Sequence, residues 1–174
     1  MNRSIVLTGP MGSGKSSVAH LLAAQLGLQV VDLDACIVEQ AGKTVNQIFA
    51  EYGEAGFRER ESAELARLVG RTDMVLATGG GVITRPENRR LLPLIGLVVN
   101  LTASVGELAH RLATADDRPL LQGEESLAAR ISRLMLEREA WYAEADIRID
   151  TTGKTLEDVA NSILASYRGA VGVL

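Results

Sequence analysis

A phosphate-binding motif close to the start of the chain limits the folds that this sequence can adopt. The P-loop pattern G-x-x-x-x-G-K-[ST] is matched without a gap by Gly9-Pro10-Met11-Gly12-Ser13-Gly14-Lys15-Ser16. A short apolar run, Ser4–Thr8, precedes the motif, and an amphipathic stretch, Ser16–Leu26, follows it. This pattern is typical of a turn that joins a buried strand to a helix. We therefore predict an α/β domain that binds a nucleoside triphosphate.

The residue types in this motif each have a physical task at a polyphosphate. Glycines let the backbone wrap around the phosphates and point its N–H groups inward, while the following helix directs its positive dipole end at them. We expect Lys15 to reach the β- and γ-phosphates and the Ser16 hydroxyl to bind Mg²⁺. A chance glycine-rich turn is the alternative, and the strand-to-helix context argues against it. The predicted ATP-binding residues of this segment are Gly12, Ser13, Gly14, Lys15, Ser16 and Ser17.

Short apolar runs recur along the chain and alternate with longer amphipathic stretches. This order is expected of a parallel sheet covered by helices, and continuous apolar runs indicate strands buried on both faces. After Ser4–Thr8, the predicted strands are Gln29–Asp32, Met74–Ala77, Leu97–Leu101 and Ile147–Asp150. The predicted helices are Ser16–Leu26, Ser104–Ala113, Ser126–Tyr142 and Leu156–Tyr167. The stretch Leu33–Gly70 is expected to hold three short helices, because it is interrupted by Gly42, Gly53 and Gly56.

The number and order of these elements predict one domain over residues 1–174. We expect a three-layer αβα fold of the P-loop NTPase type, with a five-stranded parallel sheet in the order 2-3-1-4-5. Residues 33–61 are expected to form a helical substrate-binding segment. The polar stretch 115–125, which contains glycine and proline, is the candidate for a lid.

Composition excludes several other classes of protein. The net charge of −4 is opposite to the basic surface that nucleic-acid binding needs, so we expect no nucleic-acid partner. Cys36 is the only cysteine, which rules out an intrachain disulfide and argues against a thiolate metal cluster. The apolar run Ile5–Leu7 is too short for a signal peptide or a membrane span, so we expect a cytoplasmic protein without a membrane partner. We further expect that the chain acts as a monomer.

Further short motifs follow the P-loop along the chain. They are Asp32-Leu33-Asp34, Phe57-Arg58-Glu59-Arg60-Glu61, Thr78-Gly79-Gly80-Gly81, Arg118-Pro119-Leu120-Leu121, and Arg138 late in a helix before Tyr142. In these motifs and their order the chain resembles the shikimate kinase family from its first strand to its last helix. The resemblance implies that Mg-ATP donates its γ-phosphoryl group to the 3-hydroxyl of shikimate. The products would be shikimate 3-phosphate and ADP, in aromatic amino-acid biosynthesis.

The resemblance also implies roles for two acidic residues and for the glycines. Asp34 is similar to the carboxylate that hydrogen-bonds the shikimate hydroxyls and can take a proton during transfer. Taken alone, an aspartate at this position is better interpreted as a helix N-cap, and Asp32 has the same alternative. Asp32 is similar to the residue that holds Mg²⁺ through water. Gly79, Gly80 and Gly81 imply close approach of the backbone to the acceptor, with the Gly80 N–H available to bind it, and a tight turn is the alternative.

Arginines supply the cations of the implied site. Arg58 and Arg138 resemble the residues that grip the shikimate carboxylate, for which a planar guanidinium with two parallel donors is suited. Glu61 lies three residues after Arg58 on the same helical face and is placed to hold that guanidinium, although such a pair is more often exposed. Arg118 would arrive with the lid, stabilise the transferring phosphoryl group and help to exclude water. The implied catalytic residues are Lys15, Asp34 and Arg118.

Some parts of the chain match the family pattern loosely. Arg111 and the loop Asp150–Lys154 are expected near the adenine by analogy alone. In the family, a proline often follows the arginine that matches Arg138. This chain has Glu139-Ala140-Trp141-Tyr142 there instead, so the end of the predicted helix Ser126–Tyr142 is in question. Arg60 has no counterpart in the family motif and is expected to face the solvent.

Two other functions stay compatible with the sequence. One is a P-loop kinase of another small acceptor, such as gluconate or a nucleoside monophosphate. The other is a nucleotide-binding regulatory module without transfer activity. The set of Lys15, Ser16, Asp34 and Arg118 argues against such a module, because a sensor needs no groups that orient an acceptor. A GTPase is disfavoured because the sequence contains no N-K-x-D motif.

Overall fold

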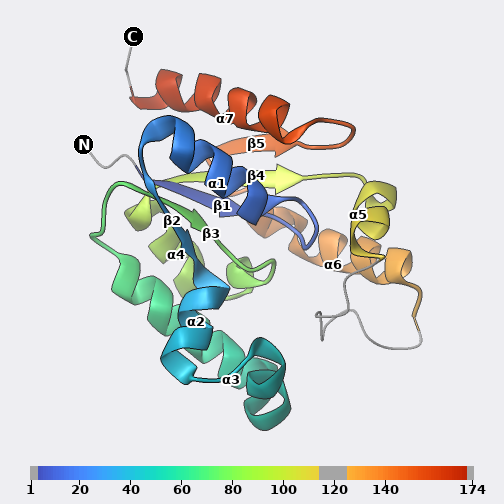
Figure 1. Cartoon of the computed structure of the whole chain (residues 1–174). Helices are drawn as coiled ribbons and strands as arrows, with labels where there is room; N and C mark the ends of the chain where they lie inside the picture. Colours follow the sequence, from blue (N-terminus) through green and yellow to red (C-terminus); the bar gives the residue numbers. More distant parts are fainter. Residues whose placement is uncertain (1–3, 114–124, 172–174) are drawn as a thin grey trace.

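Five short strands form one parallel sheet in the computed structural model, which describes residues 4–113 and 125–171 (Figure 1). The strands are β1 (Ile5–Thr8), β2 (Gln29–Asp32), β3 (Met74–Ala77), β4 (Leu97–Thr102) and β5 (Ile147–Asp150). Their order, β2-β3-β1-β4-β5, confirms the order predicted from the sequence. The central strand is β1, in which Val6 pairs with Leu76 of β3 on one side and with Val98 of β4 on the other.

Helices cover both faces of this sheet (Figure 1). They are α1 (Lys15–Leu26), α2 (Leu33–Ala41), α3 (Val45–Leu68), α4 (Pro86–Ile95), α5 (Val105–Leu112), α6 (Leu127–Tyr142) and α7 (Leu156–Val171), with a short 3-10 helix, η1, at Val82–Thr84. Because successive strand residues point to opposite faces, Leu7 packs in the core under α1 and α7, whereas Val6 packs in the core under α3 and α4. None of the helices in the described ranges is both long and apolar enough to span a lipid bilayer.

The segment between β2 and β3 forms the three helices predicted from its glycines, although one of the three predicted breaks is absent. Gly42 ends α2 as expected. Gly53, with a φ of 67° and a ψ of −176°, is not helical and divides α3 into two helices that meet at a kink. Gly56 lies within the second of these helices, so the prediction of a break there is wrong. The kink sets the direction of the second half of α3, which carries Arg58 and Glu61.

The sequence reasoning missed α4 and η1, which connect β3 to β4. Pro86 occupies the first turn of α4, where the absence of its N–H removes no helical hydrogen bond. Pro93 lies inside the helix and is typical of a break, which hides the helical spacing. Leu92 and Ile95, three residues apart and both buried, are the signal that could have revealed the helix.

Gly53→Ala is expected to destabilise the fold. The backbone conformation at Gly53 is one that residues with a Cβ rarely adopt, although no atom lies within 4 Å of a Cβ built there. We expect the free energy of unfolding in urea to fall by about 1–3 kcal/mol. The control is Gly106→Ala in α5, where the space is also open and alanine is expected to raise stability by up to about 1 kcal/mol. Unchanged stability of Gly53→Ala would contradict this account of the kink.

Candidate active site

A cavity of about 450 Å³ opens where β1, β2 and β3 end. The carboxyl edge of a parallel sheet is where ligands of open α/β folds bind. The P-loop forms one part of its wall, the residues after β2 and β3 form another, and α3 supplies the rest. The lining residues are Met11, Gly12, Gly14, Lys15, Ser16, Ser17, Asp32, Asp34, Val45, Phe49, Phe57, Arg58, Thr78, Gly79, Gly80 and Gly81.

Lys15 lies folded across the P-loop at the side of this cavity. Its Nζ donates hydrogen bonds to Gly9 O at 2.8 Å and to Pro10 O at 2.9 Å, with Ser13 Oγ at 3.4 Å. Lys15 is also the first residue of α1, so the positive end of the helix dipole faces the same space. A cation and a helix N-terminus therefore meet at the part of the cavity that the P-loop lines, which suits a phosphate group.

Ser16 and Asp32 meet beside the P-loop. Ser16 Oγ donates a hydrogen bond to Asp32 Oδ2 at 3.3 Å, and Ala35 N donates one to Asp32 Oδ1 at 3.1 Å. Asp32 is therefore the N-cap of α2, and Asp34 lies inside the first turn. The N-cap alternative for Asp34 is wrong, because its neighbour takes that place. A hydroxyl and a carboxylate at this spacing fit Mg²⁺, which binds hard oxygen ligands and keeps several waters.

The three glycines after β3 lie where charged side chains come close to the backbone. A Cβ on Gly79 would lie 3.2 Å from both Asp34 Oδ1 and Glu61 Oε1. A Cβ on Gly81 would overlap the Arg58 guanidinium. The segment is also a turn, because Val82 N donates a hydrogen bond to Gly79 O at 3.2 Å. The tight-turn interpretation therefore describes this segment, and close approach of its backbone to an acceptor stays a prediction.

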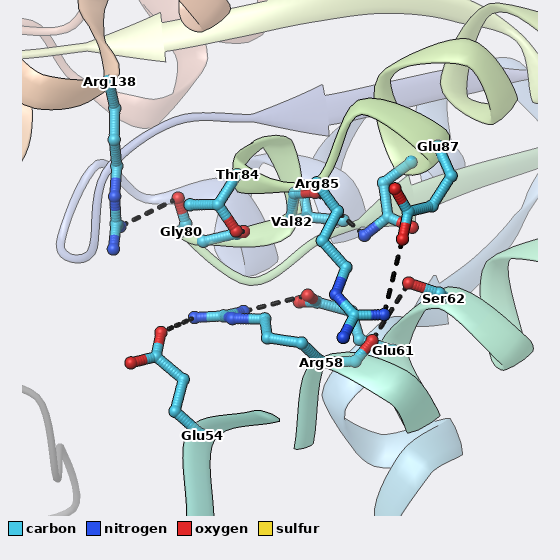
Figure 2. Close-up of polar contacts among 12 residues, drawn as sticks. Glu54, Arg58, Glu61, Ser62, Gly80, Val82, Thr84, Arg85, Glu87 and Arg138 are labelled. Carbon is cyan, nitrogen blue, oxygen red and sulfur yellow. Dashed lines mark hydrogen bonds and ion pairs between the residues drawn. The ribbon is translucent and has the colours of Figure 1, made fainter. Parts of the chain in front are cut away.

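Arg58 is a buried cation held by a buried carboxylate. Its side chain contacts Glu61 Oε2 at 2.9 Å through Nη1 and Glu54 Oε1 at 3.4 Å through Nη2 (Figure 2). Glu61 is fully buried. Burial raises the pKa of Glu61, and the neighbouring charges of Arg58 and Arg138 oppose this rise. The alternative of an exposed ion pair is therefore wrong for Arg58 and Glu61.

Arg138 approaches the same glycines from α6. Its Nη1 donates a hydrogen bond to Gly80 O at 3.2 Å, and Figure 2 shows Arg138 and Arg58 extending toward this segment from two different helices. Tyr142, one turn after Arg138, donates a hydrogen bond to the same oxygen at 2.5 Å. Arg138 lines a neighbouring hollow of about 20 Å³ that shares Met11 with the large cavity. The sequence reasoning gave Tyr142 no role, and its four-residue spacing from Arg138 is the signal that could have suggested one.

Arg111 of α5 connects the P-loop to the loop after β5. Its Nη1 donates hydrogen bonds to Gly12 O at 3.2 Å and to Thr151 Oγ1 at 3.1 Å, and its Nη2 contacts Glu107 at 2.8 Å. The structure thus brings Arg111 and the loop Asp150–Lys154 together beside the phosphate-binding residues. Their contact with an adenine stays a prediction.

An apolar wall completes the cavity, and the sequence reasoning did not name it as part of the site. It consists of Val45, Phe49 and Phe57 of α3. The rings of Phe49 and Phe57 lie with their centroids 4.9 Å apart. Val45 and Phe49 are four residues apart on one helical face, which is the signal that could have placed them together. The wall gives the cavity apolar surface beside its charged groups, which suits a small ring with polar substituents.

Two further predictions have separate outcomes. Arg118 and residues 115–124 of the candidate lid lie outside the described residues. Arg60, expected to face the solvent, is half-buried. Its Nη1 donates a hydrogen bond to Gly56 O at 2.9 Å, and its guanidinium lies 4.1 Å from the ring centroid of Tyr52. The expectation for Arg60 is therefore only partly correct.

Comparisons with known proteins agree on one family. Residues 11–168 match the sequence model of the family described as shikimate kinase. The shikimate kinase of Geobacter metallireducens is 51% identical over 168 residues, which cover 96% of this chain and 93% of that protein. Among solved structures, a shikimate kinase from Acinetobacter baumannii in complex with shikimate has a TM-score of 0.91 at 38% identity, covering 96% of this chain and 93% of that one. The shikimate kinase of Aquifex aeolicus has a TM-score of 0.83 at 32% identity, covering 97% and 98%.

Glu61→Ala is expected to destabilise the protein far more than Glu54→Ala, although both residues contact Arg58. Removing Glu61 leaves Arg58, a residue that is 6% exposed, without its buried counter-charge, which typically costs about 3–5 kcal/mol. Glu54 is half exposed, so its loss is expected to cost less than about 1 kcal/mol. Urea denaturation of both variants measures the difference. Equal effects would contradict the assignment of Glu61 as the residue that holds Arg58.

Proposed function

The chain belongs to the shikimate kinase family, and we propose that it transfers the γ-phosphoryl group of ATP to the 3-hydroxyl of shikimate. The products are shikimate 3-phosphate and ADP, and the reaction serves the biosynthesis of chorismate and the aromatic amino acids. The relative from Acinetobacter baumannii, whose solved structure holds shikimate, supports this choice of acceptor.

The observation that carries the proposal is a single cavity with two kinds of wall. Lys15 and Ser16 of the P-loop line it beside Asp34, Arg58 and the glycine segment 79–81. Lys15 and Ser16 suit the phosphates of ATP. Of the acceptor-binding residues, the second group, the Asp34 carboxylate can accept hydrogen bonds from hydroxyls, and the Arg58 guanidinium can bind a carboxylate. Shikimate carries hydroxyls and a carboxylate on one small ring, so the second group matches its chemistry.

In the proposed reaction, Asp34 orients the acceptor hydroxyl. The 3-oxygen of shikimate attacks the γ-phosphorus while the bond from that phosphorus to the ADP oxygen breaks, and Asp34 takes the hydroxyl proton. Arg58, held in place by Glu61, binds the shikimate carboxylate together with Arg138. Gly80 contributes its N–H to the acceptor. Fixed geometry at both ends of the acceptor is what converts binding into an in-line attack.

The nucleotide is proposed to lie over the P-loop. Three hydrogen bonds of Lys15 go to neutral oxygens, and phosphate oxygens are stronger acceptors for a cation. Ser16 would bind Mg²⁺ directly, and Asp32 would bind it through water. Mg²⁺ in this position would neutralise charge on the β- and γ-phosphates. Arg111 is proposed to lie at the base of the nucleotide. The remaining proposed contacts to ATP come from Gly12, Ser13, Gly14 and Ser17.

Further assignments complete the proposal. Residues 33–61 supply Asp34 and Arg58 and act as the substrate-binding segment of a single domain. Residues 115–125 act as the lid, and Arg118 arrives with it to stabilise the transferring phosphoryl group. We also propose that the chain works as a monomer, since residues of one chain line the cavity.

The acceptor is tested by measuring ADP release with several candidate compounds. We expect shikimate to raise the rate of ADP release by about 100-fold or more over hydrolysis without an acceptor. A site that excludes water and orients the acceptor hydroxyl favours transfer to that hydroxyl over attack by water. Mass spectrometry and ³¹P NMR identify the product as the 3-phosphate. A higher kcat/KM with gluconate or a nucleoside monophosphate would overturn the proposed acceptor. ATP binding without any phosphorylated product would favour the regulatory module.

Lys15→Ala is expected to lower kcat for shikimate phosphorylation by at least about 100-fold. Loss of a single group that stabilises developing charge has effects of this size. The matched control is Lys43→Ala, which removes a lysine that pairs with Glu51 at the surface, and its kcat is expected to stay near the wild-type value. The measurement is the initial rate of ADP release at saturating shikimate and Mg-ATP. A Lys15→Ala enzyme with more than a tenth of wild-type kcat would contradict this role.

A further inference from the structure

Gly80 O accepts two hydrogen bonds from one helix. Tyr142 Oη lies 2.5 Å from it and Arg138 Nη1 lies 3.2 Å from it. Tyr142 is 4% exposed and Arg138 is 6% exposed, so both bonds lie in the protein interior. A carbonyl oxygen has two lone pairs, which allows both donors to bind at the same time.

These two hydrogen bonds have different fates when an anionic acceptor binds. A guanidinium forms stronger hydrogen bonds with a carboxylate than with a neutral carbonyl, so an acceptor carboxylate can draw Arg138 away from Gly80 O. A buried carbonyl left without a donor is unfavourable. Tyr142 removes this penalty, because its hydroxyl stays on Gly80 O when the guanidinium leaves.

We propose that Tyr142 is a positioning residue for acceptor binding. Its hydroxyl donates a hydrogen bond to Gly80 O, and this bond leaves the Arg138 guanidinium free to bind the acceptor carboxylate. The inference rests on the proposed function, since it needs an acceptor with a carboxylate. The same bond fixes the peptide between Gly80 and Gly81. Because C=O and N–H point in opposite directions across a trans peptide, it aims the N–H of Gly81, a residue that lines the cavity, away from α6.

The surroundings of Tyr142 suit a fixed donor. Its ring packs in the core cluster that contains Leu92 and Val98. Burial raises the pKa of Tyr142 to about 12, so the hydroxyl keeps its proton throughout the neutral range. Both side chains line the small hollow that shares Met11 with the large cavity. The two donors differ in the side chain itself, because the Tyr142 ring is packed in the core, whereas the long, unbranched side chain of Arg138 can change its rotamer.

Tyr142→Phe tests the inference without emptying the core. The ring stays, and Gly80 O keeps Arg138 as its donor, so that an acceptor carboxylate has to compete with Gly80 O for the guanidinium. We expect KM and Kd for shikimate to rise about ten-fold, or about 1.4 kcal/mol. We expect kcat and the KM for Mg-ATP to stay within about two-fold of wild type. The control Tyr167→Phe removes a tyrosine hydroxyl from the other core, under α7, and is expected to change none of these constants.

A double-mutant cycle with Arg138→Ala separates positioning from a purely structural role. Arg138→Ala itself raises the KM for shikimate, and in that background no guanidinium has to be released. Adding Tyr142→Phe is then expected to change the KM for shikimate by less than about two-fold. Its effect is expected in the free energy of unfolding in urea, which should fall. An equal rise in KM in both backgrounds, or a parallel rise in the KM for Mg-ATP, would overturn the inference. If the double variant does not fold, the Kd values of Tyr142→Phe decide, and an unchanged Kd for shikimate overturns it.

Failure of this inference can be distinguished from failure of the proposed function. If the wild-type enzyme phosphorylates shikimate and Tyr142→Phe keeps the wild-type KM, only the role of Tyr142 is wrong. If the wild-type enzyme phosphorylates other acceptors but not shikimate, the proposed function is wrong. The inference fails with it if the acceptor has no carboxylate, as in a nucleoside monophosphate. For gluconate, which has one, an unchanged KM in Tyr142→Phe overturns the inference.

Discussion

Three consecutive glycines after β3 let charged side chains from α2, α3 and α6 approach one stretch of backbone. Asp34 and Glu61 lie where a side chain on Gly79 would be, and Arg58 lies where one on Gly81 would be. Because β3 is hydrogen-bonded to β1, the same stretch also touches the P-loop, and a Cβ on Gly80 would lie 3.2 Å from Met11 N. The spacing between the phosphate-binding and acceptor-binding parts of the cavity is thus set by the sheet and by the absence of side chains at its edge.

This arrangement gathers cations and carboxylates at one site in a chain whose net charge is −4. Burying Arg58 and Glu61 together is weak evidence for stability, because desolvation of two charges offsets most of their attraction. The pair has a clearer geometric effect, since Glu61 is fully buried and can hold the guanidinium in one orientation. The overall charge describes the surface, whereas the chemistry of the site depends on a few buried groups that composition does not reveal.

The sequence predicts local features well and long-range contacts poorly. The P-loop and the strands depend on motifs and apolar runs that are read within a few residues. The order of the strands, which the structure confirms, is expected from the P-loop type of fold and not from a local run. The failures have physical causes. Pro93 hides α4 because a proline usually ends a helix, and Gly56 is tolerated inside α3 because tertiary packing outweighs its low propensity. The bond between Tyr142 and Gly80 joins residues 62 positions apart, and only the packing of α6 against the end of β3 reveals it.

The cations of the site differ in what holds them, and this difference bears on how they can act. Three hydrogen bonds of Lys15 go to oxygens of its own loop, and Arg138 donates to Gly80 O, so the acceptors of these four bonds are neutral. An arriving phosphate or carboxylate is a stronger acceptor than these oxygens and can replace them at little cost. Arg58 is held by the carboxylates of Glu61 and Glu54, which a ligand cannot easily displace. Arg58 is therefore suited to a fixed position, whereas Lys15 and Arg138 are suited to exchanging partners when ligands bind.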